Sequence, residues 1–282
     1  MNQKMLYSAQ ELHAAQKDKA VLIVDCRFFL SDTEKGFRDY LHAHIPGAVY
    51  AHLDDDLSSP VTSDSGRHPL PNADRFAAFL ARSGWQPGTT LVAYDDAGGA
   101  IAARLWWLMN YFGHGQAALL DGGLQAWQSA GYELESGQVK VAAAEPVMIE
   151  VRSGLVVSSR DILKGVADQS ICLADVRAAE RFKGEVEPLD PVAGHIPGSV
   201  NFPFQLSLEP DDRFKPANDI RKLLLDFAES QQAGELVFMC GSGVTACHAV
   251  FSAELVGLKG SKLYAGSWSE WIRDRSRPVE PA

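Results

Sequence analysis

The sequence predicts an α/β fold made of two similar domains in tandem, each a parallel β-sheet with helices on both faces. Two observations lead to this prediction. Apolar, β-rich runs alternate with helical patterns along the chain, and such alternation is typical of parallel strands that are joined by helices. The same motifs also occur twice in the same order, once in each half of the chain, which indicates a duplicated unit.

The predicted elements follow from the apolar spacing in each half. In the first half, the β-rich runs are VLIVD (21–25) and TLVAYD (90–95), and the helical patterns are SAQELHAAQ (8–16), ADRFAAFLARSG (73–84) and RLWWLMNYFG (104–113). In the second half, they are ICLADV (171–176), ELVFMC (235–240) and the helical SRDILKGVAD (159–168). Helical runs show apolar residues three and four apart, whereas buried strands are short continuous apolar runs.

Four pairs of motifs define the duplication. The pairs are VLIVDCR (21–27) with ICLADVR (171–177), AHIPGAV (43–49) with GHIPGSV (194–200), LVAYDDAGG (91–99) with LVFMCGSGV (236–244), and LLDGGLQAW (119–127) with KLYAGSWSEW (262–271). The stretch from Ser136 to Gly154 has no clear counterpart and carries small and polar residues. The sequence therefore predicts a first domain over 1–138, a linker over 139–152 and a second domain over 153–282.

Composition limits the class of protein and its partners. The chain has 282 residues, of which 46% are hydrophobic and 22% charged, with a formal net charge of −10. A globular protein is expected, and the acidic balance argues against nucleic acid or an anionic membrane as a partner. The polar start of the chain lacks the apolar core of a signal peptide, and no apolar run has membrane-spanning length, so a cytoplasmic location is expected.

The four cysteines are expected to be reduced thiols. Cys26, Cys172, Cys240 and Cys247 are too few for a disulfide scaffold in a chain of this size, and none stands in a pair or cluster with zinc-site spacing. No metal site is predicted.

One of these thiols stands in a chemically distinctive loop. In MCGSGVTACH (239–248), an apolar strand ends at Cys240, and a helical pattern starts at Val244. Two glycines allow the backbone to curl with its N–H groups inward, and the next helix adds its own unpaired N–H donors. Such a cup binds an anion, and it favours the thiolate that a sulfur nucleophile needs. Ligands of open parallel sheets bind at the carboxyl ends of the strands, where Cys240 is expected.

The first copy of the unit differs at this position. Asp95 stands where the second copy has Cys240, and a carboxylate cannot act as a sulfur nucleophile. The first domain is therefore predicted to be non-catalytic. Asp25, Asp175, His44 and His195 occur in both copies, which favours a structural role in loop hydrogen bonding, and Cys247 is interpreted as core packing.

These motifs resemble those of the tandem-rhodanese sulfurtransferases, the family of thiosulfate sulfurtransferase and 3-mercaptopyruvate sulfurtransferase. The resemblance covers nearly the whole chain and includes HIPG in both halves, LLDGG, the loop CGSGVT and the downstream GSW. It implies two rhodanese domains, of which only the C-terminal one is catalytic, and a persulfide carried on Cys240. The implied reaction is covalent ping-pong catalysis, for which no metal or organic cofactor is expected.

The resemblance also implies the roles of other residues. Arg181, in ERFKG, matches the substrate-binding arginine of the family, and the loop N–H groups that would hold the thiolate and the persulfide belong to Gly241, Ser242, Gly243, Val244 and Thr245. The family's proton relay joins the loop serine, here Ser242, to a histidine and an aspartate from the first domain. His68 in RHPLP matches the histidine, and Asp54 in HLDDD is the nearest match to the aspartate, with Asp55 and Asp56 beside it.

The sulfur donor is left open between two small molecules. In the family, the neutral Cys-Gly-Ser-Gly loop goes with 3-mercaptopyruvate, whereas cationic loops go with thiosulfate, which carries two charges. Mercaptopyruvate enzymes commonly have a second arginine in an EPR segment, and this sequence has Glu187-Pro188-Leu189 there. The prediction is transfer from 3-mercaptopyruvate to a thiol or cyanide acceptor. Thiosulfate as donor, or a sulfur carrier that delivers persulfide to a partner protein, remain the alternatives.

Overall fold

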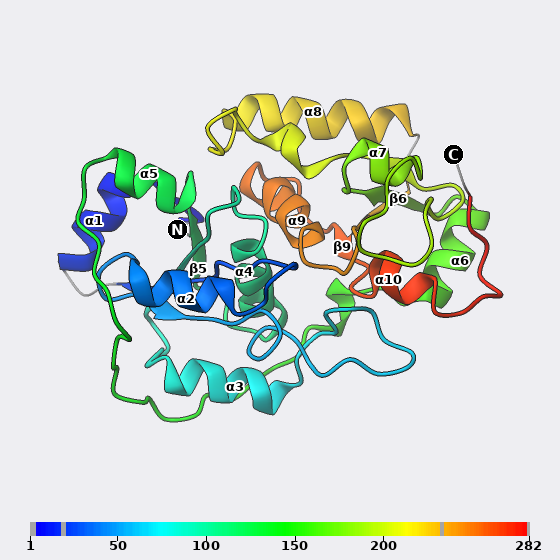
Figure 1. Ribbon diagram of the computed structural model, residues 1–282. Helices are drawn as coiled ribbons and strands as arrows, with labels where there is room; N and C mark the ends of the chain where they lie inside the picture. The colour runs from blue at the N-terminus through cyan, green and yellow to red at the C-terminus, as the bar shows by residue number, and fades with distance from the viewer. Residues whose placement is uncertain (1–3, 18–20, 232–233, 281–282) are drawn as a thin grey trace. The chain divides into compact units, whose positions relative to one another are not determined.

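The computed structural model describes residues 4–17, 21–231 and 234–280, and the chain forms two compact units (Figure 1). Unit 1 runs to Ser59 and continues over Leu70–Arg152 and Pro210–Phe214. Unit 2 comprises Pro60–Pro69, Ser153–Glu209 and the chain from Lys215 onwards.

Each unit includes a short segment from the other half of the chain, which the sequence does not indicate. Residues 60–69, from the first half, belong to unit 2, and residues 210–214, from the second half, belong to unit 1. The stretch 139–152, predicted as a linker, is part of unit 1, where Ala144 N donates to Ala81 O at 2.8 Å. The boundaries at 138 and 153 stay a prediction.

Unit 1 is built on a parallel sheet. Within the described residues its strand order is β1-β5-β4-β2-β3, with every neighbouring pair parallel. The strands are β1 (Leu6–Tyr7), β2 (Val21–Asp25), β3 (Val49–Tyr50), β4 (Thr90–Tyr94) and β5 (Ala117–Leu120). The predicted strands β2 and β4 are neighbours inside the sheet and not at its edges. Strands in this position are covered on both faces, so continuous apolar runs are expected there.

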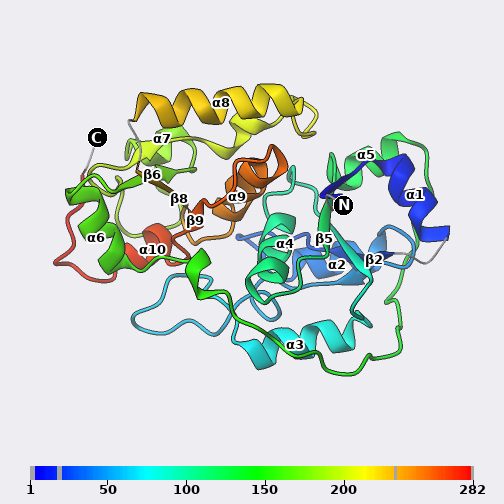
Figure 2. The same cartoon turned by 180° about the vertical axis from the view of Figure 1, so that it is seen from behind.

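Helices cover this sheet on both faces. They are α1 (Ala9–Lys17), α2 (Lys35–His42), α3 (Ala73–Arg82), α4 (Ala102–Tyr111) and α5 (Gly123–Ser129). Ile23 and Val92 pack in one cluster with residues of α1 and α5. Their neighbours along the strands point to the other face because side chains alternate. Helix α4 contacts β4 and β5, and Figure 2 shows it next to β5.

Unit 2 repeats the central part of this topology. Its sheet has the order β7-β6-β8-β9, all parallel, and its strands are β6 (Ile171–Asp175), β7 (Val200–Asn201), β8 (Glu235–Met239) and β9 (Lys262–Leu263). Its helices are α6 (Ser159–Ala167), α7 (Ala179–Phe182), α8 (Ala217–Ser230), α9 (Ala246–Leu255) and α10 (Ser267–Trp271), with 3-10 turns at Ser153–Leu155 and Phe204–Ser207. One core cluster joins α6 and α10 to the sheet, and α9 packs on β8 and β9. The predicted α/β fold with flanking helices is confirmed.

The register of the strands confirms the duplication. Asp25 pairs with Tyr94 in unit 1, and Asp175 pairs with Met239 in unit 2. The next residue in each case, Asp95 or Cys240, therefore starts the loop at the carboxyl end of the equivalent strand. Among the described residues, no helix is long and apolar enough to cross a membrane.

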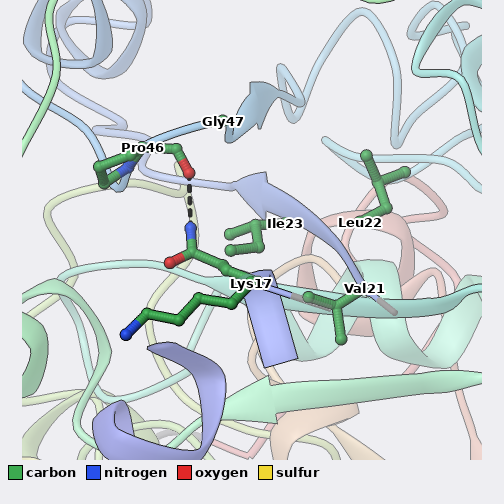
Figure 3. Close-up of a pocket in the computed structure, with 7 residues that line it drawn as sticks. Lys17, Val21, Leu22, Ile23, Pro46 and Gly47 are labelled. Carbon is green, nitrogen blue, oxygen red and sulfur yellow. Dashed lines mark hydrogen bonds between the residues drawn. The ribbon is translucent and has the colours of Figure 1, made fainter. Parts of the chain in front are cut away.

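Unit 1 also contains a pocket of about 430 Å³ at the start of β2 (Figure 3). Gln16 Nε2 donates to Pro46 O across it at 2.6 Å. The other lining residues are Lys17, Val21, Leu22, Ile23 and Gly47. None of these side chains is a nucleophile of the thiol or hydroxyl type, and the candidate active site lies elsewhere.

Candidate active site

Cys240 is held at the end of β8 by backbone hydrogen bonds to the start of α10. Its N–H donates to Ser267 Oγ at 3.1 Å, and its carbonyl accepts from Trp268 N at 3.0 Å. The residue is 2% exposed. The strand and the helix therefore fix the backbone from which the thiol projects, and a fixed position is what an attacking group needs.

The loop after Cys240 curls around the sulfur. Gly243 N donates to Cys240 Sγ at 3.2 Å. Gly243 has φ +76°, and a Cβ there would lie 2.2 Å from Ala265 O, so only glycine fits. None of the described residues accepts a hydrogen bond from the N–H groups of Gly241, Ser242, Val244 and Thr245. These donors remain available to a negative charge on sulfur or on a bound ligand.

The helix after the loop adds further partial positive charge near the sulfur. Thr245 is the N-cap of α9, and it makes no side-chain cap hydrogen bond. The N-terminal end of a helix carries a partial positive charge from its unpaired N–H groups. Because α9 begins at Ala246, six residues after Cys240 in the sequence, its first turn continues the loop.

Ser242 and His68 are in contact, as the resemblance implies. Ser242 Oγ lies 2.7 Å from His68 Nδ1, and the two residues are 6% and 3% exposed. Both belong to unit 2, because His68 is in the exchanged segment 60–69. A buried hydroxyl beside an imidazole can pass a proton to or from the loop.

Asp54 belongs to unit 1. Its backbone N–H donates to His52 Nδ1 at 3.2 Å, and the N–H of Asp55 donates to the same nitrogen at 3.3 Å. Asp56 is nearly buried and forms an ion pair with Arg82. The place of Asp54 in the proton relay stays a prediction.

Arg181 stands in the last turn of α7 and is held by a buried carboxylate. Its Nη2 donates to Glu187 Oε1 at 2.7 Å, and its Nε donates to Glu187 Oε2 at 3.2 Å. The side chain of Glu187 is only 3% exposed. This two-pronged contact fixes the plane of the guanidinium, which a lysine could not reproduce.

Sequence reasoning missed two residues of this site, Arg67 and Asp190. Arg67 Nη1 donates to Asp190 Oδ1 at 2.6 Å, and Arg181 Nη2 lies 3.4 Å from Asp190 Oδ2. One signal was available: Arg67 directly precedes His68 in the RHPLP motif. Nothing in the spacing places Asp190 between two arginines, because this contact joins segments that lie far apart in the chain.

The duplicated aspartates, Asp25 and Asp175, make the predicted loop hydrogen bonds, and their partners are arginines. Asp25 accepts hydrogen bonds from Arg27 Nε and backbone N, and Asp175 accepts the same bonds from Arg177. Each arginine also donates to the carbonyl before the HIPG motif, Ala43 O at 2.7 Å or Gly194 O at 2.8 Å. In unit 2, Arg177 additionally lies over the ring of Trp268.

The equivalent loop of unit 1 is closed by its own side chain. Asp95 is 1% exposed, and its carboxylate accepts from four backbone N–H groups at 2.8 to 2.9 Å. The donors are Ala97, Gly99, Ile101 and Ala102. In unit 1, the Asp95 carboxylate therefore occupies the cup of loop N–H groups. In unit 2, the equivalent cup surrounds the Cys240 thiol, and several of its N–H groups have no acceptor among the described residues.

Two other thiols lie in settings that disfavour reaction. Burial and the charges of Asp25, Asp95 and Asp56 raise the pKa of Cys26 well above its usual value, and burial raises the pKa of Cys172. A raised pKa leaves less thiolate at neutral pH, so both thiols should be alkylated slowly, with rates that increase as the pH rises. We expect iodoacetamide at neutral pH to spare both in the folded protein, as measured by peptide mass, and to modify both in urea. Equal rates of alkylation in the folded protein and in urea would contradict this expectation.

Comparison with known proteins agrees with the repeat. The model of the rhodanese-like domain matches residues 8–130 and 158–274. A probable 3-mercaptopyruvate sulfurtransferase of Pseudomonas aeruginosa is 42% identical over 281 residues, which cover 99% of each chain. A putative thiosulfate sulfurtransferase of Mycobacterium tuberculosis is 38% identical over 98% of this chain and 96% of its own.

A solved structure shows the same fold. The 3-mercaptopyruvate sulfurtransferase from Leishmania major is 30% identical, with a TM-score of 0.81 over 95% of this chain and 74% of that chain. The predicted resemblance is thereby confirmed. The chain belongs to the rhodanese-like domain family and carries two copies of the domain.

Proposed function

We propose that the protein is a sulfurtransferase that moves sulfur from 3-mercaptopyruvate to a thiol or cyanide acceptor through a persulfide on Cys240. The observation that carries this proposal is the difference between the two loops. In the loop of unit 1, four backbone N–H groups donate to the Asp95 carboxylate. In the loop of unit 2, one N–H group donates to Cys240 Sγ. A cup with spare donors around a thiol suits a sulfur atom that must hold a negative charge in two states, thiolate and persulfide. The relatives named as 3-mercaptopyruvate sulfurtransferases support the same activity.

In the first step, the Cys240 thiolate attacks the sulfur of the donor. An S–S bond forms as the C–S bond of 3-mercaptopyruvate breaks, and the bonding pair stays on carbon as the enolate of pyruvate. A proton on that carbon completes pyruvate. Cys240 is left as a persulfide, and the N–H groups of Gly241, Gly243 and Val244 are proposed to stabilise its charge.

His68 and Ser242 are proposed to supply that proton. Their contact of 2.7 Å supports a relay from the imidazole through the hydroxyl. Histidine suits the task because it exchanges protons near neutral pH. Asp54 is proposed to orient the imidazole, as an aspartate does in the family's relay.

In the second step, a thiolate or cyanide attacks the outer sulfur of the persulfide. The S–S bond breaks, its electron pair returns to Cys240 as a thiolate, and the product is an acceptor persulfide or thiocyanate. The enzyme is then ready for another donor. A cytoplasmic location, and the lack of nucleic-acid or membrane partners, remain predictions from the composition.

Steady-state kinetics with the two donors, and with cyanide as acceptor, test this function. We expect kcat/KM for 3-mercaptopyruvate to exceed that for thiosulfate by about tenfold or more. The reason is that Glu187 and Asp190 neutralise the charge of Arg67 and Arg181. The attraction that dianionic thiosulfate gains in the site is then smaller than the hydration free energy that it loses on leaving water. A preference for thiosulfate would favour that donor, which the name of the mycobacterial relative also suggests. A single turnover with no further product would instead indicate a sulfur carrier.

A further inference from the structure

Ser269 joins two segments of unit 2 that lie far apart in the sequence. It stands in α10 and is 4% exposed. Its hydroxyl oxygen accepts from Arg67 N at 2.9 Å, and its own backbone N–H donates to Gly241 O at 2.9 Å. One buried residue therefore contacts both the residue before His68 and the residue after Cys240.

The contact of α10 with the Cys240 loop does not use the serine hydroxyl. Trp268 N donates to Cys240 O at 3.0 Å, and the bond from Ser269 to Gly241 is likewise between backbone groups. Both bonds can therefore remain when the hydroxyl is removed. The hydroxyl itself lies 3.5 Å from Gly266 O of its own helix, and the acceptor that it offers is used by the segment that carries His68.

This segment, residues 60–69, approaches α10 most closely at Gly66. A Cβ on Gly66 would lie 2.5 Å from Gly266 O and 3.0 Å from Ser269 Oγ. Any other residue would push the segment away from the helix. The glycine therefore allows the backbone of the segment to come within hydrogen-bond distance of the serine hydroxyl.

The position of His68 depends on this contact because the bond is made by the residue directly before it. His68 is 3% exposed, and its Nδ1 lies 2.7 Å from Ser242 Oγ. A hydrogen bond of this length is lost when one partner moves by about 1 Å. Fixing the backbone at Arg67 therefore keeps the imidazole at the hydroxyl of Ser242.

Two other contacts hold this segment and are independent of the serine hydroxyl. Arg67 Nη1 donates to Asp190 Oδ1 at 2.6 Å, and Arg273 Nε donates to Ser65 O at 3.3 Å. Neither bond fixes the backbone N–H of Arg67. Removing the hydroxyl of Ser269 should therefore shift the backbone beside His68 without releasing the segment.

We propose that Ser269 is a positioning residue of the proton relay: its hydroxyl holds the backbone at Arg67 so that His68 stays in contact with Ser242. This rests on the proposed function, in which His68 and Ser242 protonate the enolate carbon of pyruvate. The effect of Ser269 is then confined to the step that forms pyruvate. Neither the loss of sulfite from thiosulfate nor the attack of cyanide on a persulfide requires a proton on carbon.

Single-turnover rates of Ser269→Ala test this selectivity. After mixing with 3-mercaptopyruvate, we expect the variant to release pyruvate about 10-fold more slowly than the wild type, because a proton donor misplaced by about 1 Å loses much of its effect. The persulfide form, mixed with cyanide, should release thiocyanate within about twofold of the wild-type rate, and loading of sulfur from thiosulfate should be equally unaffected. A wild-type rate of pyruvate release, or an equal loss in the pyruvate and thiocyanate steps, would overturn the proposal.

A double variant tests whether Ser269 acts through His68. In the His68→Ala background, Ser269→Ala should change the rate of pyruvate release by less than about twofold, because losses at residues that act as one unit are not additive. A further loss of about 10-fold in that background would show that the hydroxyl acts on something other than the relay, and the proposal would fail.

Ser252→Ala is the matched control for the loss of a buried hydroxyl. Ser252 lies in α9 of the same unit and is 0% exposed, and its Oγ donates to His248 O at 2.9 Å within its own helix. We expect wild-type rates in both steps. If Ser252→Ala instead slows pyruvate release selectively, the effect is not specific to Ser269 and the proposal is wrong.

Gly66→Ala disturbs the same contact from the other side. The added methyl group should separate the segment from α10, so this variant should show the same selective loss as Ser269→Ala. Pyruvate release at the wild-type rate in Gly66→Ala would contradict the close approach on which the proposal depends.

Failure of the proposed function gives a different result. A wild type that releases no pyruvate from 3-mercaptopyruvate, and gains no sulfur on Cys240 by intact mass, would refute the sulfurtransferase activity itself. A wild type that does both, with a Ser269→Ala variant of unchanged rates, would refute only the role of Ser269.

Discussion

Cys240→Ser is expected to abolish sulfur transfer from both 3-mercaptopyruvate and thiosulfate, with kcat lower by a factor on the order of 10⁶, the loss expected when a covalent enzyme loses its nucleophile. A hydroxyl at this place stays protonated at neutral pH, and its oxygen cannot form a persulfide. Because Gly243 N lies 3.2 Å from the sulfur, serine fits the same cup, and the loss would report chemistry rather than folding. Initial rates of pyruvate and thiocyanate formation measure it.

A second thiol provides the matched control for this substitution. Cys172 in β6 is nearly buried, and Cys172→Ala removes a thiol from the core of the same unit. We expect this variant to keep wild-type kcat and to gain one sulfur atom by mass. Residual turnover in Cys240→Ser above about one thousandth of the wild-type rate would mean that another group carries the sulfur.

The sequence alone was enough for the fold because its strongest signals are local. The runs at 21–25 and 171–175 are apolar on both faces, which only a strand in the middle of a parallel sheet requires. The repeat then predicts that Asp95 and Cys240 occupy equivalent places, and the strand register confirms this. The contact of Ser242 with His68 was predicted from the family resemblance rather than from spacing.

The remaining parts of the site depend on contacts between distant segments. Arg67 lies in a stretch without regular secondary structure that has no counterpart in the repeat, and its position is set by Ser269 and Asp190. Neither periodicity nor composition encodes such a contact. The same holds for Glu187, whose carboxylate orients Arg181 and Arg177 together.

The equivalent loops of the two units differ in how many of their inward N–H groups have an acceptor. A loop with several inward N–H groups needs a negative partner to be stable when buried. In unit 2, the sulfur of Cys240 accepts from one of these groups, Gly243 N. In unit 1, the carboxylate of Asp95 accepts from four of them.

Asp95→Ala is therefore expected to destabilise the protein by about 3–5 kcal/mol, because four backbone N–H groups lose their acceptor and two of them are in buried hydrogen bonds. Water entering the vacated space would offset part of the cost. For a domain of this size, the melting temperature should fall on the order of 10 °C. Thermal unfolding followed by circular dichroism, with urea titration at 25 °C for the free energy, measures both quantities.

The neighbouring residue supplies the control for this loss. Burial and the charge of Asp95 raise the pKa of Asp96, so its charged carboxylate is disfavoured in the folded state. Asp96→Asn removes that charge and should leave the stability unchanged or raise it. Asp95→Asn keeps the shape of the side chain but turns an N–H donor toward the loop donors, and it should cost nearly as much as alanine. If Asp95→Ala and Asp96→Asn have the same stability, the Asp95 carboxylate does not stabilise its loop. The proposed difference between the Asp95 loop and the Cys240 loop is then wrong.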